Sequence, residues 1–353
     1  MRLKNVLCAL LCVVISLGAL SSCNKSDPEI VDPEVQAKSY YEYFDTNSVV
    51  MSYAGDSPQA FSANCEAVSE VLREYHRLFD IYHEYAGINN LMTVNKNAGV
   101  APVEVDVKLI DFLIYCKEIY TLTDGKTNVA MGSVLKLWHD ERERAENKPD
   151  KARVPSLEAL STAAQHTNID ALVIDKAAGT VYISDPEMRL DVGAIGKGYA
   201  TERAAEVLID AGVASYVLNI GGNLRAIGTK PSGKGWTTGI TNPDKSSEES
   251  FVCKVDISDI SLVTSGDYER YYVVDGVKYH HIIDPVTLMP AAYFSSVSVF
   301  IDDGGLADAL STALFCMSYE DGKRLAESVG ADVVWVTLDG TVLMTDGVET
   351  VEK

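Results

Sequence analysis

The chain is organised around two glycine-rich segments, LDVGAIGKGYA at residues 190–200 and YVLNIGGN at residues 216–223. Three glycines interrupt the apolar run behind Asp191, and Lys197 stands between two of them. Glycine has no β-carbon, so the backbone can turn here with its amides and carbonyls facing outward. Residues 201–211 have apolar side chains at helical spacing. A glycine turn with a lysine, a helix, and a strand ending in glycines are together compatible with a phosphate-binding cradle.

These glycines match neither of the two common nucleotide-binding fingerprints. The P-loop pattern G-x-x-x-x-G-K-[ST] is absent, and VGAIGKG does not read G-x-G-x-x-G. On the glycines alone, an ordinary tight loop is the simpler interpretation.

The N-terminus predicts a lipoprotein signal peptide. Arg2 and Lys4 precede an apolar run at residues 6–20, which is followed by Ser21-Ser22-Cys23. A charged segment, an apolar segment and small residues at a cleavage site are typical of secretion signals. A cysteine directly after Leu-Ser-Ser resembles a bacterial lipobox, which implies lipidation of Cys23; the alternative is a plain signal peptide with an incidental cysteine. The expected organisation is a signal peptide at 1–22, a polar tether at 23–39 and a single domain at 40–348.

The composition is acidic, with 30 Lys and Arg against 51 Asp and Glu and a formal net charge of −21. This charge argues against nucleic acid or an anionic lipid surface as a partner, which leaves the lipid on Cys23 as the membrane attachment. An apolar fraction of 47% supports a sizeable core. The cysteines beyond residue 23 lie far apart in apolar segments, so buried free thiols are expected rather than a metal site, and a disulfide stays undecided: Cys65, Cys116, Cys253 and Cys316.

Hydrophobic periodicity predicts an α+β protein. Helical patterns cover residues 57–82, 105–120, 156–163, 201–211, 306–317 and 322–329. Strand patterns cover residues 40–53, 171–174, 180–183, 215–220, 236–241, 251–257, 271–274, 277–281, 295–301, 331–338 and 341–344. The asparagine-rich residues 89–97 suggest a polar loop, and the charged residues 142–153 suggest a solvated face or loop.

A second informative segment is LADALSTAL at residues 306–314. Asp308, Ser311 and Thr312 have the spacing i, i+3 and i+4, which predicts that their oxygens project from one helical face. Hard oxygen ligands of this kind suit Mg²⁺, which often shares phosphate oxygens with a substrate. A polar stripe near a helix start is the alternative, and such triplets are common.

A third segment, VTSGDYER at residues 263–270, is followed by YHHIIDP at residues 279–285. Adjacent histidines on a strand point to opposite faces, so His280 and His281 are not expected to bind one metal ion together. One of them could instead place a base beside the carboxylate of Asp284.

Taken in order, DVGAIGKGYA, NIGGN, TSGDYER, HIIDP and ADALSTA resemble the ApbE family of FAD:protein FMN transferases. Weaker similarity lies upstream in FDT at 44–46, FDIY at 79–82 and AMGSVLKLW from residue 130. The resemblance covers about residues 40–344. It implies a single T-fold-related α+β catalytic domain that binds FAD with Mg²⁺, breaks the pyrophosphate, transfers FMN to a threonine hydroxyl of a target protein as a phosphoester, and releases AMP.

The resemblance also implies roles for individual residues. Asp308 and Thr312 match the metal-binding side chains, and Ala194 matches the position that offers a backbone carbonyl, whereas Ser311 receives no ligand role. The histidine important for transfer corresponds to His281. Positions that contact the flavin nucleotide correspond to Phe44, Tyr82, Ala130, Met131, Gly132, Asp191, Lys197 and Ile283. The family usually has a glycine shortly before the proline that follows this histidine motif, so Leu288 or Met289 must adapt the turn here.

Two other functions would use the same residues: an Mg²⁺-dependent FAD pyrophosphatase that delivers water, and a lipid-anchored flavin-binding protein without turnover. The Asp308 and Thr312 pair favours catalysis, because storage needs no phosphate-bound metal. The expected partners are FAD and an exported acceptor, such as a subunit of a membrane redox complex. The expected location is the periplasmic side of a bacterial membrane, with attachment through Cys23.

Overall fold

A computed structural model of the chain describes residues 34–53 and 55–351. The expected signal peptide and Cys23 lie outside the described residues. The predicted strand at 40–53 is two strands, β1 (Val35–Tyr40) and β2 (Ser48–Tyr53), which pair antiparallel. The ordered domain therefore begins inside the segment predicted as tether. It also extends past residue 348, because β16 (Thr350–Val351) pairs with β9.

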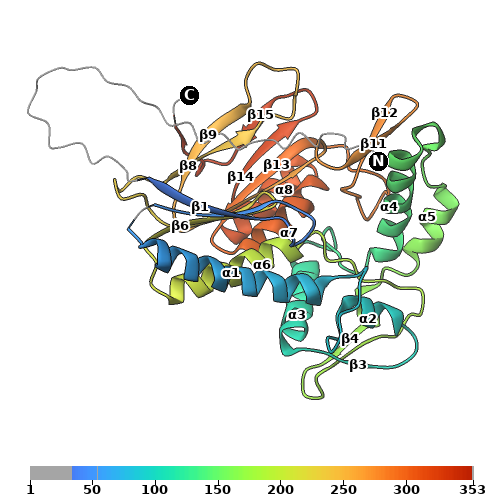
Figure 1. Cartoon of the computed structure of the whole chain (residues 1–353). Coiled ribbons are helices and arrows are strands. Elements are labelled where there is room, and N and C mark those ends of the chain that lie inside the picture. The colour runs from blue at the N-terminus through green and yellow to red at the C-terminus, as the bar shows by residue number, and fades with distance from the viewer. Residues whose placement is uncertain (1–33, 54, 352–353) are drawn as a thin grey trace, which may run out of the picture.

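The centre of the fold is an eight-stranded sheet in the order β1-β2-β6-β7-β10-β13-β14-β15 (Figure 1). Each neighbouring pair in it is antiparallel. Its remaining strands are β6 (Ser215–Ile220), β7 (Asn223–Gly228), β10 (Ser261–Gly266), β13 (Phe294–Ile301), β14 (Asp332–Thr337) and β15 (Val342–Met344). The sequence patterns missed β7 and β10, in which polar residues and glycines interrupt the apolar alternation.

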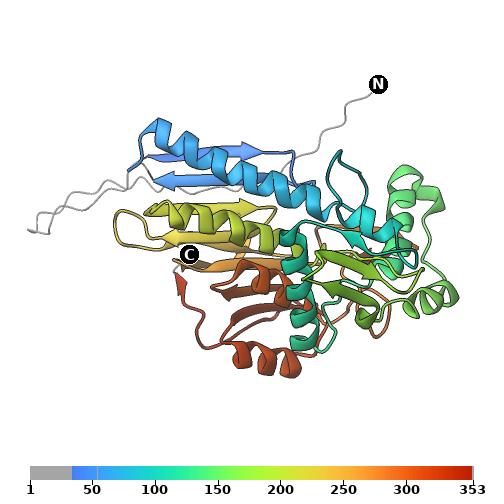
Figure 2. The same ribbon diagram turned by 90° about the horizontal axis from the view of Figure 1, so that it is seen from below.

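Both faces of this sheet are covered. One face packs against helices α1 (Pro58–Phe79), α6 (Gly196–Asp210) and α7 (Gly304–Phe315), as Figures 1 and 2 show; α8 (Tyr319–Val329) packs beside α7 and β14. The other face packs against a three-stranded sheet of β8 (Trp236–Thr241), β9 (Phe251–Ile257) and β16. Successive side chains of β6 point to opposite faces of the sheet: Val217 packs against β8 and β9, and Leu218 packs in the core formed with the helices.

The remaining elements gather at one end of the sheet (Figure 1). They are helices α2 (Leu91–Lys96), α3 (Val107–Leu122), α4 (Gly132–Asn147) and α5 (Leu157–Ala164), the short helices η1 (Pro149–Lys151) and η2 (Ile169–Ala171), the sheet of β3 (Val103–Glu104), β4 (Leu172–Asp175) and β5 (Thr180–Ile183), and the hairpin of β11 (Tyr271–Val274) and β12 (Val277–His280).

Two segments interpreted as loops are partly helical. Residues 89–97 contain α2, whose first turn is capped by the side chain of Asn90. Residues 142–153 continue α4 to Asn147. Not every charged side chain of this segment points only to solvent: Arg144 and Arg153 donate hydrogen bonds to the carboxylate of Glu141, which is buried.

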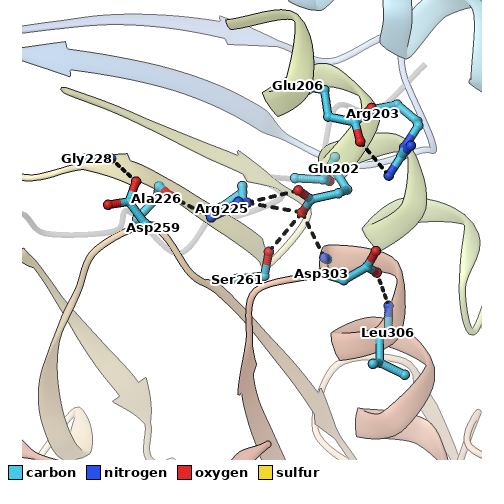
Figure 3. Close-up of polar contacts among 12 residues, drawn as sticks. Glu202, Arg203, Glu206, Arg225, Ala226, Gly228, Asp259, Ser261, Asp303 and Leu306 are labelled. Atoms are coloured by element: carbon cyan, nitrogen blue, oxygen red, sulfur yellow. Dashed lines mark hydrogen bonds and ion pairs between the residues drawn. The ribbon is translucent and has the colours of Figure 1, made fainter. Parts of the chain in front are cut away.

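A buried carboxylate joins the helical layer to the sheet (Figure 3). Glu202 on α6 forms an ion pair with Arg225 on β7, with Nε 3.1 Å from Oε2. The same oxygen accepts hydrogen bonds from the hydroxyl of Ser261 on β10 at 3.3 Å and from the amide of Gly304 at 2.8 Å. Since Gly304 is the first residue of α7, Glu202 fixes the start of the helix that carries Asp308.

The cysteine prediction is confirmed for the residues that the structure describes: Cys65, Cys116, Cys253 and Cys316 are buried and unpaired. Within residues 34–53 and 55–351, no helix has the length and apolar composition needed to cross a membrane.

Candidate active site

A cleft of about 1680 Å³ lies between the helical layer, the central sheet and the elements that gather at one end of that sheet. Ordinary small-molecule pockets measure roughly 300–1,000 Å³, so this cleft has room for a dinucleotide. Its walls include the first turn of α6, one face of α7, strand β10, the start of α4 and the loop after β12.

The first wall is built by a close crossing of α6 and α7. Helix α6 begins at Gly196, so two of the three glycines interpreted as a turn, Gly196 and Gly198, form its first turn, whereas Gly193 lies in a turn just before the helix. A β-carbon on Gly198 would lie 2.2 Å from the carbonyl oxygen of Gly304 and 2.4 Å from the β-carbon of Asp308. Only glycine permits this approach, which brings the amide ends of α6 against the side chain of Asp308.

Asp308 is buried beside two donors from α6. Its Oδ2 accepts a hydrogen bond from the amide of Gly198 at 2.8 Å and lies 3.5 Å from the ammonium nitrogen of Lys197. Burial raises the pKa of Asp308, and the Lys197 charge and the Gly198 amide oppose that rise. The carboxylate therefore lies at a helix N-terminus, next to a cation, with access to the cleft.

The i, i+3, i+4 prediction is correct for two of its three residues. Asp308 and Thr312 line the cleft, as does Ala194 at the start of α6. Ser311 is fully buried and does not share this face, because its hydroxyl bonds to Ser265 on β10 and to the carbonyl of Asp308, both at 2.8 Å.

The oxygen donors at this wall fit a hard cation such as Mg²⁺. They comprise the carboxylate of Asp308 and the hydroxyl of Thr312, to which the family resemblance adds the backbone carbonyl of Ala194; such a set leaves positions for water and phosphate oxygens. Among the described residues, no three His, Cys, Asp or Glu side chains converge as ligands for a metal ion. The oxygen donors named above are compatible with a metal that shares phosphate oxygens of a bound molecule.

The two histidines occupy different environments, as predicted, but the strand ends at His280, so the difference does not come from alternation along it. His280 ends β12 and is buried, with Nε2 2.9 Å from the carbonyl oxygen of Ala291 and Nδ1 accepting from the amide of Ile282. His281 lies just after the strand and is open to the cleft, with Nδ1 3.2 Å from the carbonyl oxygen of Arg270. The surrounding protein and the charge of Arg270 lower the pKa of His281, which favours its neutral imidazole.

The structure brings the residues predicted to contact the nucleotide into this one cleft, with a single exception. Those that line it are Phe44, Tyr82, Met131, Gly132, Asp191, Lys197 and Ile283. Ala130 does not line it; its side chain is fully buried in the helical core. The backbone of Gly132 approaches Arg189 closely, with its amide 3.0 Å from the Arg189 carbonyl oxygen.

Comparison with known proteins places the chain in a family. The family model described as the ApbE family matches residues 44–335. The chain belongs to the ApbE family. It is 34% identical over 273 residues to a FAD:protein FMN transferase of Treponema pallidum (strain Nichols), a match that covers 73% of each chain. It is 29% identical over 279 residues to a FAD:protein FMN transferase of Klebsiella pneumoniae (strain 342), covering 78% of this chain and 84% of that one.

Solved ApbE structures have the same fold. The ApbE protein of Thermotoga maritima superposes with a TM-score of 0.78 at 27% identity, covering 89% of this chain and 97% of that chain. The apo flavinyl transferase ApbE of Pseudomonas stutzeri superposes with a TM-score of 0.73 at 25% identity, covering 90% and 96%. The α+β fold class predicted from the sequence is therefore confirmed.

Sequence reasoning missed two cations at the ApbE cleft. Arg142 lies in the segment assigned to solvent, yet its side chain is only 19% exposed, lines the cleft and places Nη2 3.0 Å from Nδ1 of His139. Its spacing of four from the buried Trp138 could have indicated this face. Lys126 reaches Asp284 at 3.1 Å and links the turn before α4 to the loop that carries His281.

The atypical turn after the histidine motif is accommodated at Leu288. This residue has a φ of 62°, in the left-handed region that glycine would occupy without strain. Its carbonyl accepts a hydrogen bond from the indole of Trp138 at 3.0 Å. The prediction that Leu288 or Met289 adapts this turn is confirmed, and Leu288 is the residue that does so.

Proposed function

We propose that this protein is an Mg²⁺-dependent FAD:protein FMN transferase, which attaches FMN through a phosphoester to a threonine of a target protein and releases AMP. Membership of the ApbE family and the activity named for its relatives support this function. The observation that carries it is the contact of Asp308 with the first turn of α6, in a cleft large enough for FAD.

The residues proposed to hold Mg²⁺ are Asp308, Thr312 and the carbonyl of Ala194. Bound there, the ion would neutralise charge on pyrophosphate oxygens. The chain itself supplies a second positive charge, because the ammonium of Lys197 lies 3.5 Å from the Asp308 carboxylate. Fixed charges of this kind stabilise the transition state of phosphoryl transfer without reorganising during the reaction.

His281 is proposed as the base for the acceptor. Its neutral ring can take the proton of a threonine hydroxyl, which is a weak nucleophile until it is deprotonated. The threonine oxygen then forms a bond to the FMN phosphorus, and the bond from that phosphorus to the bridging oxygen breaks. The bridging oxygen leaves with AMP, and the imidazole, whose pKa is lowered, passes the proton on to solvent.

The proposed function is tested by incubating the protein with FAD, Mg²⁺ and a candidate exported acceptor. AMP release together with an FMN mass increase on an acceptor threonine supports the transferase. Equal AMP release with and without acceptor, and no modified peptide, would instead indicate a pyrophosphatase. FAD binding without AMP would indicate a flavin-binding protein.

We further propose that the enzyme is exported and lipid-anchored through Cys23, with its acceptor among exported flavoproteins such as subunits of membrane redox complexes. The charged and apolar pattern of residues 2–20 and the Leu-Ser-Ser-Cys sequence support this location. Metabolic labelling with a fatty-acid analogue tests it, since a Cys23→Ala variant should incorporate no label.

A further inference from the structure

Two aromatic residues of the cleft, Phe44 and Tyr82, come from different loops. Phe44 lies between β1 and β2, and Tyr82 follows the end of α1. The Phe44 loop is unusual because two successive non-glycine residues, Phe44 and Asp45, have φ values of 54° and 51°. Such a conformation persists only where surrounding contacts hold it.

His76, on the last turn of α1, supplies such a contact. Its Nδ1 accepts a hydrogen bond from the amide of Phe44 at 3.2 Å, and the two rings meet edge to face with centroids 5.6 Å apart. An accepting Nδ1 carries no proton, so the hydrogen of the neutral ring lies on Nε2. Burial lowers the pKa of His76, which favours this neutral form.

The contact continues to a buried carboxylate. Nε2 of His76 lies 3.4 Å from the hydroxyl oxygen of Tyr85, and that hydroxyl donates to Oδ2 of Asp80 at 2.8 Å. The other oxygen of Asp80 accepts from the amides of Tyr82 at 2.7 Å and His83 at 2.9 Å. Burial alone would raise the pKa of Asp80, but these hydrogen bonds lower it, so the carboxylate is charged.

We propose that His76, Tyr85 and Asp80 form a positioning network that holds Phe44 and Tyr82 together as one binding face for FAD. Asp80 fixes the backbone of Tyr82 directly, and it fixes the backbone of Phe44 through Tyr85 and His76. All five residues line the cleft. Tyr82 is 54% exposed, so burial does little to hold it; beside the contact of its ring with that of His139, with centroids 5.7 Å apart, the backbone anchor to Asp80 fixes its position. The inference rests on the proposed function, because it assigns the network to the FAD substrate.

The test compares Tyr85→Phe with a matched control, Tyr43→Phe. The control also removes a tyrosine hydroxyl near His76, one that bonds to Ser69 at 2.7 Å, but it leaves the network intact. FAD affinity is measured by quenching of flavin fluorescence without an acceptor, and fold stability by thermal unfolding. Tyr85→Phe removes the 2.8 Å hydrogen bond to Asp80 and the longer 3.4 Å contact with His76, so it should weaken FAD binding roughly 3- to 10-fold, whereas Tyr43→Phe should not.

Three further measurements separate positioning from a structural role. His76→Leu should weaken FAD binding as Tyr85→Phe does, and His76→Asn, which retains an acceptor, should restore part of it. The double variant of Tyr85→Phe and His76→Leu should be no weaker than either single variant, because both break one network. At saturating FAD, kcat should stay within about two-fold of the wild-type value while KM for FAD rises.

The inference is overturned if Tyr85→Phe binds FAD as tightly as Tyr43→Phe does. It is also overturned if the fold-losses of FAD affinity in Tyr85→Phe and His76→Leu multiply in the double variant, or if kcat falls while KM for FAD is unchanged. A wild-type protein that binds FAD but modifies no acceptor would refute the proposed transfer, and the affinity comparison would still decide the network. A wild-type protein that does not bind FAD would refute both.

Discussion

Replacing Gly198 with alanine tests the link between helix packing and the active site. The added methyl group would lie 2.2 Å from the carbonyl oxygen of Gly304, whereas an ordinary carbon–oxygen contact is about 3.3 Å or more. The helices must therefore separate by about 1 Å. Alanine favours a helix by about 1 kcal/mol over glycine, and overpacking typically costs about 1–3 kcal/mol. A net loss of up to about 2 kcal/mol in unfolding free energy is expected.

The effect on catalysis should be larger than the effect on stability. Asp308 lies four residues beyond Gly304 on the displaced helix, and a misplacement of about 1 Å can reduce a rate about 10²-fold. Urea unfolding measures the stability, and FMN transfer at increasing Mg²⁺ measures the site. Gly55→Ala is the control, because a methyl group there meets nothing within 4 Å. Wild-type transfer by Gly198→Ala would refute the argument that this crossing positions Asp308.

Five other substitutions test separate parts of the molecule. Asp308→Asn should abolish transfer with little change in the unfolding curve, because it removes a metal-binding charge from the cleft wall; unchanged transfer at limiting Mg²⁺ would contradict the assignment. His281→Ala should slow transfer roughly 10²–10⁴-fold with little change in FAD affinity, and lost FAD binding would assign His281 to binding instead. His280→Ala should chiefly lower stability, since its ring has two buried hydrogen bonds; a rate loss equal to that of His281→Ala would contradict the division. Because the pKa of His76 is lowered in the native state, the native state binds fewer protons than the unfolded chain below pH 6.5. The stabilising contribution of His76 is therefore present above pH 6.5 and is lost as pH falls toward the folded pKa. His76→Asn should reduce the slope of unfolding free energy against pH in this range by at most about 1.4 kcal/mol per pH unit, and an unchanged slope would contradict this. Cys23→Ala should release a soluble protein that still binds FAD, as equilibrium binding can verify, and loss of binding would contradict the assignment of Cys23 to membrane attachment alone.

The elements that the sequence predicted well are those with a single amphipathic face. Helix α1 follows its predicted span closely, because Ser57 caps it, Pro58 begins it and its apolar side chains recur at helical spacing. Strand β7 escaped prediction because Asn223 and Arg225 are buried polar residues in it. The burial of Arg225 depends on Glu202, a partner distant in sequence that no local pattern reveals.

The sequence predicted which residues belong to the site but not how they are arranged in space. Family resemblance identified positions such as Lys197, Asp308 and His281, which lie on three separate elements and line one cleft. Their contacts with FAD and Mg²⁺ remain predictions. Arg142 was missed because it stands in a run of charges typical of a solvated face, although its helix packs that side against the cleft.

The glycines show why the local sequence could not supply the geometry. Glycine is required either where φ is positive or where another atom comes too close for a side chain. Gly221 and Gly222 meet the first condition, with φ values of 57° and 88°. Gly198 meets the second, and the atoms that come too close belong to Gly304 and Asp308, more than a hundred residues away. A pattern search sees the same letter in both cases and favours a turn. Only the tertiary contact distinguishes them, and the same contact brings the Gly198 amide and Lys197 to the carboxylate of Asp308.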